Sequence, residues 1–230
     1  MKKKIIILII ASAALAAVGL GYRFYENFLI ETRIGNYEYC LKLARDFPDR
    51  KAEIVAQCEK EASIARQPDD YHNYVNIPLG WKNLGEQTES DVFIKRAIVI
   101  YLIAFDKFDA KYLTSWNLAQ LYAQLGDLKS AEQYFLAAIE NNNLESEPYL
   151  ATAEFYRYKL KKSAEFLIGF YERALKAVTI DPDVILDDYG RYLCDIGEYA
   201  SALKQYEKLA ARRPGSFSVI ISDLKEKIKE

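Results

Sequence analysis

Two short stretches of this chain decide its fold: residues 81–85 read WKNLG, and residues 115–119, which lie 34 positions later, read SWNLA. Further matches at the same spacing pair small or aromatic residues: Ala97 with Ala131, Tyr101 with Phe135, and Ala104 with Ala138. The same order of residue types returns around residues 153–174 and 190–209. A period of this length indicates a repeat protein, in which each unit buries its apolar face only by stacking on its neighbours.

The residues that recur within each window also have helical spacing. Ala131, Phe135 and Ala138 stand at i, i+4 and i+7, which places them on one face of a helix. The pattern W-x-N-L-G, then G, then A-x-x-x-F/Y-x-x-A resembles that of the tetratricopeptide repeat family. The resemblance implies four repeats of two antiparallel helices, at residues 78–111, 112–145, 146–182 and 183–216. The third repeat is longer, and we expect its extra residues in the turn at 160–163.

The expected architecture is therefore an all-α, right-handed α-solenoid of four helix-turn-helix repeats. Small residues such as Gly85 and Gly190 let the first helix of a repeat approach its neighbours closely, and large aromatic residues fill the space between repeats. Residues 217–230 are predicted to form a C-terminal capping helix, because Ile220, Leu224 and Ile228 make one apolar stripe on an otherwise charged segment.

The N-terminal segment 1–22 is predicted to be a transmembrane helix that anchors the protein. Three lysines precede residues 5–21, which form an uncharged run of 17 residues. Such a helix spans roughly 26 Å, close to the thickness of a bilayer core. The leading lysines favour a cytoplasmic N-terminus, with residues 22–230 on the periplasmic or extracellular side. The alternative is a cleaved signal peptide, which would make the protein secreted.

Residues 23–77 are predicted to form a helical hairpin that links the anchor to the repeats. Gly35-Asn36-Tyr37 resembles Gly197-Glu198-Tyr199 of the fourth repeat, so the hairpin has features of a degenerate repeat. Residues 47–50 form the turn of the hairpin, 51–66 its second helix, and 67–77 a loop.

Two cysteines flank the predicted turn symmetrically. Cys40 and Cys58 are equidistant from residue 49, so an antiparallel hairpin places them at the same height. They are either joined by a disulfide, which an oxidising compartment would permit, or packed as two buried thiols. Cys194 has no such partner and is expected to be a buried free thiol.

Composition and motifs argue against catalysis. The chain has one histidine, and we find no nucleophile motif, metal-ligand pattern or phosphate-binding glycine loop. We therefore expect neither a catalytic nor a metal site, and neither a cofactor nor a small-molecule substrate. A formal net charge of −2 argues against nucleic acid as the main partner. The remaining function class is recognition of a protein or peptide by the surface of the chain.

The family resemblance implies where such a partner binds: the first helices of the repeats line a concave groove. The groove residues implied in this chain are Lys82, Asn83, Glu86, Trp116, Asn117, Gln120, Gln124, Glu154, Arg157, Tyr158, Asp188 and Arg191. Glu147, Asp187 and Asp195 belong to the same implied face, which carries more acidic than basic residues. Acidic residues disfavour a peptide's terminal carboxylate. Trp116 either anchors the partner or packs between repeats.

The sequence thus predicts a membrane-anchored repeat scaffold that binds a protein or peptide in its concave groove, in cell-envelope assembly or protein export. The alternatives are a self-associating structural scaffold and an accessory subunit of an enzyme complex.

Overall fold

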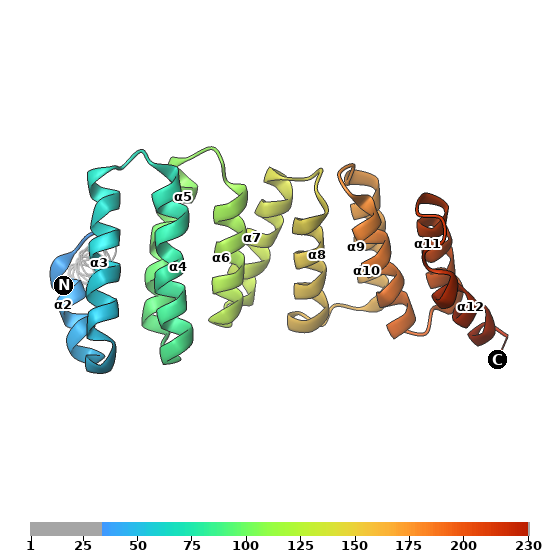
Figure 1. Ribbon diagram of the computed structural model, residues 1–230, viewed down its shortest axis with the longest axis horizontal. Helices are drawn as coiled ribbons and strands as arrows, with labels where there is room; N and C mark the ends of the chain where they lie inside the picture. Colours follow the sequence, from blue (N-terminus) through green and yellow to red (C-terminus); the bar gives the residue numbers. More distant parts are fainter. Residues whose placement is uncertain (1–33, 230) are drawn as a thin grey trace, which may run out of the picture. The chain divides into compact units, whose positions relative to one another are not determined.

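The computed structural model of the protein describes residues 34–229, and in this part of the chain the fold is all-α (Figure 1). Eleven α-helices, a 3₁₀ turn and a π-helical turn follow one another there, and β pairing is limited to an isolated bridge between Glu145 and Ile180. The prediction of an all-α helical repeat fold is confirmed for these residues. The predicted membrane anchor at residues 1–22 lies outside them. Among the described helices, none combines the length and the apolar character needed to cross a membrane.

The chain divides into two compact units, with the boundary between Lys107 and Phe108. The described elements of the first unit are α2 (Tyr37–Asp46), η1 (Pro48–Arg50), α3 (Lys51–Arg66), α4 (Tyr71–Thr88) and α5 (Asp91–Lys107). Those of the second unit are α6 (Tyr112–Gln124), α7 (Leu128–Asn141), α8 (Ser146–Glu154), η2 (Phe155–Lys159), α9 (Ala164–Ala177), α10 (Pro182–Asp195), α11 (Tyr199–Arg212) and α12 (Ser218–Lys227).

One helix pair corresponds to each of the four predicted repeats: α4 with α5, α6 with α7, α8 and η2 with α9, and α10 with α11 (Figure 1). Helix α4 begins at Tyr71, before the predicted start of its repeat at residue 78. Close packing within the pairs depends on small residues. A Cβ atom on Gly85 would lie 2.5 Å from Cδ1 of Ile94, and one on Gly190 would lie 2.9 Å from the ring of Tyr206. Both distances are too short for a real contact, so these positions require glycine for the helices to pack as they do.

The first helix of the described chain, α2, begins as the second helix of a repeat does. It follows Gly35, whose φ is +73°, just as α7 follows Gly126 at +78° and α11 follows Gly197 at +80°. The Asn36 side chain then caps α2 by accepting from the N–H groups of Glu38 and Tyr39. These features agree with the expected degenerate repeat.

The predicted loop at residues 67–77 is wrong in its second half. Helix α4 begins at Tyr71, and the Asp70 side chain caps it by accepting from the N–H of His72 at 3.0 Å. Tyr74 is buried, so the added turns belong to the packed part of the unit. Pro78 is typical of a first turn but lies inside this helix.

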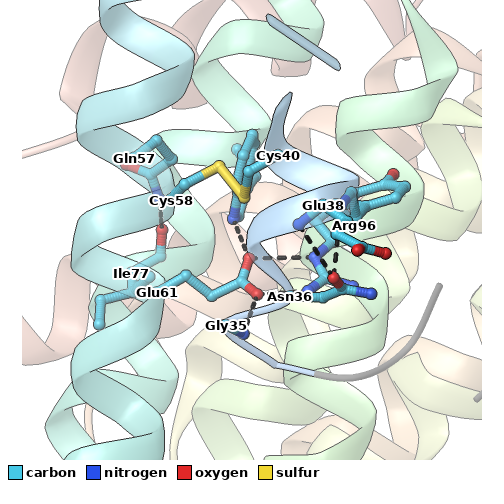
Figure 2. Close-up of polar contacts among 11 residues, drawn as sticks. Gly35, Asn36, Glu38, Cys40, Gln57, Cys58, Glu61, Ile77 and Arg96 are labelled. Carbon is cyan, nitrogen blue, oxygen red and sulfur yellow. Dashed lines mark hydrogen bonds and ion pairs between the residues drawn. A yellow bond between two sulfur atoms is a disulfide. The ribbon is translucent and has the colours of Figure 1, made fainter. Parts of the chain in front are cut away.

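A buried ion pair holds the first unit together, and Figure 2 shows it beside the disulfide. Glu61 on α3 and Arg96 on α5 have exposed fractions of 0% and 1%. Arg96 donates from Nε to the Glu61 carboxylate at 3.0 Å and makes a second bond through Nη2. The indole of Trp81 and the backbone N–H of Gly35 also donate to this carboxylate, each at 2.8 Å. One carboxylate thus joins α3 to α4, α5 and the turn that precedes α2.

The structure contains a disulfide between Cys40 on α2 and Cys58 on α3, with a Cα–Cα distance of 6.0 Å (Figure 2). Cys40 also occupies the alanine position of the repeat pattern, five residues after the turn glycine as Ala131 and Ala202 are. All three side chains are buried. Cys194 is a free, partly buried thiol on α10.

An aromatic core fills the second unit. Tyr171 on α9 stacks on Tyr189 and Tyr192 of α10, with ring centroids 4.9 and 5.7 Å apart. Leu224 of α12 is buried at the edge of this core, whereas Ile228 is 44% exposed. Helix α12 therefore covers the last repeat mainly through the middle of its predicted apolar stripe.

Candidate partner-binding site

The second unit contains a hollow of about 420 Å³ between helices of its first two repeats. One wall is α6, another is α8 with the π turn η2, and α7 contributes Phe135. A volume of this size falls in the range of about 300–1,000 Å³ that is common for ligand pockets. The lining includes Gln120, Gln124, Glu154 and Lys159 among aromatic and alanine side chains, so polar groups surround an apolar base.

The α6 wall is formed by residues with helical spacing. Trp116, Gln120 and Ala123 stand at i, i+4 and i+7 and line the hollow together with Gln124. Trp116 is only partly buried, and its ring meets that of Tyr112 edge-on, with centroids 5.8 Å apart. Of the two expected roles for Trp116, a side chain presented to the hollow fits the structure better than one enclosed between repeats.

The opposite wall depends on the π turn. Phe155 through Lys159 continue α8 with wider turns, and the N–H of Leu160 donates to the carbonyl of Phe155 at 3.1 Å, five residues back. Tyr158, which is 62% exposed, and Lys159 line the hollow from this turn. Single π turns occur often at functional sites. Here the turn sets which side chains face the hollow.

The base of the hollow is apolar. Phe135 on α7 and Phe155 are both buried, and their ring centroids are 4.8 Å apart. Glu154, immediately before the π turn, is exposed and lines the hollow. The site therefore offers aromatic surface below and to the sides, with amides and one carboxylate around them.

Next to the hollow, Arg157 connects the third repeat to the fourth. Its guanidinium lies 2.8 Å from Asp195 and 3.7 Å from Asp188, and over the rings of Tyr158 and Tyr192 at 5.1 and 5.0 Å. These contacts occupy two residues that we predicted for the groove, Arg157 and Asp188. Both connect the third repeat to the fourth, and neither lines the hollow.

Asp188 has a second partner from the core. The hydroxyl of Tyr171 donates to Asp188 at 2.5 Å, and burial together with this bond raises the pKa of Tyr171 above its usual range. The Asp188 carboxylate is therefore held by groups of its own chain on two sides.

The remaining predicted residues make local contacts. Asn117 donates from its side chain to the Leu113 carbonyl at 2.9 Å, and Arg191 lies 3.0 Å from Asp187 on the same helix. Three more, Lys82, Asn83 and Glu86, belong to α4 in the first unit. There Lys82 lies 3.7 Å from Glu86, and Asn83 lines a smaller hollow between α3 and α4.

The structure thus brings together Trp116, Gln120, Gln124, Glu154 and Tyr158 from the predicted set. Sequence reasoning did not place Phe135, Phe155 and Lys159 at the site. Phe135 was assigned to packing, and it does pack, but its ring also forms the base of the hollow. Lys159 faces the hollow from the π turn, which a regular helical pattern does not indicate.

The arrangement suits recognition of a side chain. Aromatic rings supply contact area, while the amides and the carboxylate orient a polar group. Within residues 34–229, no group of three or more His, Cys, Asp or Glu side chains could hold a metal ion.

Comparison with known proteins supports the fold. A family model described as tetratricopeptide repeat matches residues 114–143, which span most of α6 and α7. The solved structure of a monomeric IFIT1 mutant with Gppp-AAAA is similar, with a TM-score of 0.53 and 16% sequence identity. The match covers 81% of this chain and 45% of that one, so this chain corresponds to less than half of the IFIT1 chain. A search of curated proteins found no match. This chain therefore contains a tetratricopeptide repeat and has a helical repeat fold like that of IFIT1.

Proposed function

We propose that this protein is a non-catalytic scaffold that binds a segment of another protein in the hollow between its second and third repeats. One observation carries the proposal. Trp116 and Gln120 from one repeat, and Glu154 and Tyr158 from the next, line the same hollow. These residues occupy the positions that the family resemblance assigns to the partner groove. The matched tetratricopeptide repeat provides part of the lining of the hollow.

A protein partner is favoured over a nucleic acid by charge. The similar IFIT1 structure contains Gppp-AAAA. In this chain, however, the net charge is −2, and an exposed carboxylate, Glu154, lines the hollow. Phosphate groups bind to surfaces rich in lysine and arginine, because these neutralise the backbone charge. Lys159 alone supplies a positive charge among the residues lining this hollow.

We further propose that the scaffold is membrane-anchored through residues 5–21 and works outside the cytoplasm, in envelope assembly or protein export. The three lysines before the apolar run support this orientation. The Cys40–Cys58 disulfide adds support, because such bonds persist mainly in oxidising compartments. Secretion after signal cleavage is the alternative. Protease added outside sealed cells should digest residues 22–230, and full protection of these residues would exclude this location.

Binding can be tested by affinity capture and mass spectrometry with the wild-type chain and a charge-reversing variant. Gln120→Arg with Glu154→Arg places two cations in the hollow and should lower partner recovery without unfolding the protein. The matched control is Gln133→Arg with Glu140→Arg, which makes the same changes at exposed positions on α7. Equal recovery with both variants would place the binding surface elsewhere.

A further inference from the structure

We infer that the hollow in the second unit binds the cationic side chain of a basic peptide, arginine or lysine. This inference rests on the proposed function, since it specifies which protein segment the groove accepts. It follows from the combination of aromatic walls, a carboxylate in the lining and a surrounding face with more acidic than basic residues, which together select for a cation.

The aromatic walls of the hollow can attract a cation. Trp116 and Tyr158 stand on opposite walls, and both rings are at least partly accessible. A cation over the face of such a ring is attracted by its quadrupole, most strongly for tryptophan and more strongly as water is excluded. The Arg157 guanidinium already lies 5.1 Å from the centre of the Tyr158 ring. This contact is internal to the chain and covers part of the Tyr158 ring, so the attraction of an incoming cation depends mainly on Trp116.

The polar lining of the hollow supplies hydrogen-bond acceptors for a cation. The Glu154 carboxylate offers a bidentate acceptor for a guanidinium, and the side-chain carbonyls of Gln120 and Gln124 add further acceptors. Lys159 is the opposing charge in the lining, and its long flexible stem allows the ammonium to stay in solvent. A carboxylate ligand would instead face Glu154 and be repelled.

In the lining itself Glu154 is balanced by Lys159, and the negative excess comes from the residues beyond it. Four further carboxylates belong to the implied groove face of the second unit: Glu147, Asp187, Asp188 and Asp195. The two arginines of that face, Arg157 and Arg191, are both paired with these aspartates. The surface around the hollow therefore keeps a negative excess, which favours flanking basic residues in the partner and speeds its association.

The apolar base admits a competing occupant, because Phe135 and Phe155 would also contact a leucine side chain. The two occupants differ in how they respond to charge. Binding of leucine gains from burial alone, whereas binding of arginine depends on Glu154 and is weakened by salt. Citrulline, which has nearly the shape of arginine but no charge, separates these contributions within one peptide.

The test measures fluorescence anisotropy of labelled peptides with the full-length chain, purified in mild detergent. The peptides have one Gly/Ser/Asn background and carry paired arginine, lysine, citrulline, leucine or glutamate residues at their centre. We expect arginine peptides to bind about tenfold more tightly than citrulline peptides, since this ratio corresponds to one ion pair with a cation–π contact. Glutamate peptides should bind most weakly, and added salt should reduce the advantage of arginine.

Two variants connect the preference to the hollow. Glu154→Gln should lower the preference for arginine over citrulline to about threefold or less, because it removes the charge but keeps the shape. Glu140→Gln is the matched control, since it removes an exposed carboxylate from α7, and it should leave the preference unchanged. Trp116→Leu should weaken arginine peptides by a factor on the order of five while retaining apolar contact.

The outcomes separate this inference from the proposed function. If leucine or citrulline peptides bind as tightly as arginine peptides, or if Glu154→Gln leaves the preference intact, the cationic occupant is overturned and the groove still binds peptides. If no peptide binds and the Gln120→Arg, Glu154→Arg variant recovers the same cellular partners as wild type, the proposed function fails and the inference fails with it.

Discussion

Removal of one partner from the buried pair of Glu61 and Arg96 is predicted to cause a large loss of stability. Glu61→Leu should destabilise the first unit severely, because it removes the acceptor of four hydrogen bonds and leaves a guanidinium inside the protein. Both side chains are at most 1% exposed, so water cannot replace the lost partner without local unfolding.

The size of the effect follows from these contacts. Breaking a buried ion pair by removing one partner costs about 3–5 kcal/mol. Replacing both partners removes the uncompensated charge, so Glu61→Leu with Arg96→Met should be less harmful than the single change. The double variant still leaves the N–H groups of Trp81 and Gly35 without their acceptor, at a cost of about 1–3 kcal/mol. The single variant should therefore be the less stable by about 2 kcal/mol.

Intrinsic fluorescence can follow this unit selectively. The chain has two tryptophans, Trp81 in the first unit and Trp116 in the second, so a Trp116→Phe background leaves Trp81 as the reporter. With a urea m-value of about 1.5 kcal/mol/M, the single variant should lower the unfolding midpoint by about 2–3 M.

The double variant is the internal control. Unfolding of the single variant within about 1 kcal/mol of wild type would refute the importance of the pair. Equal losses in the single and double variants would show that burial of the Arg96 guanidinium without the Glu61 carboxylate is not the cause.

The remaining predictions concern packing, cross-linking and pH. Cys40→Ala with Cys58→Ala should lower the free energy of unfolding by about 3 kcal/mol, measured in urea, and a loss below about 1 kcal/mol would show that the bond adds little. Gly190→Ala should cost about 1–3 kcal/mol, because its methyl group would meet the Tyr206 ring. Gly169→Ala should be neutral or stabilising, because its methyl group would meet only the end of the Arg173 side chain, at an ordinary contact distance of 3.6 Å. Burial raises the pKa of Tyr206 to about 12, so the Tyr206 hydroxyl ionises at a lower pH in the unfolded state than in the folded state. The free energy of unfolding should therefore be constant below pH ~10 and fall as the pH rises toward ~12. Titration of every tyrosine in a single step near pH ~10, with helicity retained, would contradict this last expectation.

Much of the fold was predictable because the same residue pattern occurs several times in the sequence. Four windows of similar spacing identify the helix pairs even where single positions depart from the pattern. Local rules also worked where one strong signal acted alone. Pro48 ends one helix, and the next, α3, covers Lys51–Arg66 as expected. The symmetric placement of Cys40 and Cys58 around that turn suggested the bond that the structure contains.

The features that sequence reasoning missed depend on contacts between distant residues. Glu61 stands on the apolar stripe of α3, seven residues after Ile54, and such a position is a signal for a buried charge. Its partner Arg96 is 35 residues away, and no local pattern pairs the two. The start of α4 was missed because the Asp70 cap lies in a polar segment that resembles a loop. At the site, the aromatic base of the hollow combines residues of two repeats, so the sequence of neither repeat alone predicts it.

The π turn at Phe155–Lys159 has a genetic consequence. A π turn accommodates one residue more than an α turn, so loss of a single codon there would let the helix return to its ordinary pitch. Because the π turn already absorbs the extra residue, the side chains after the turn would keep their phase, and only those within Phe155–Lys159 would be redistributed around the axis. The wall would keep almost all its amino acids and still have one side chain fewer in the turn opposite Trp116. Selection on this surface therefore acts on the number of residues in the turn as well as on their types.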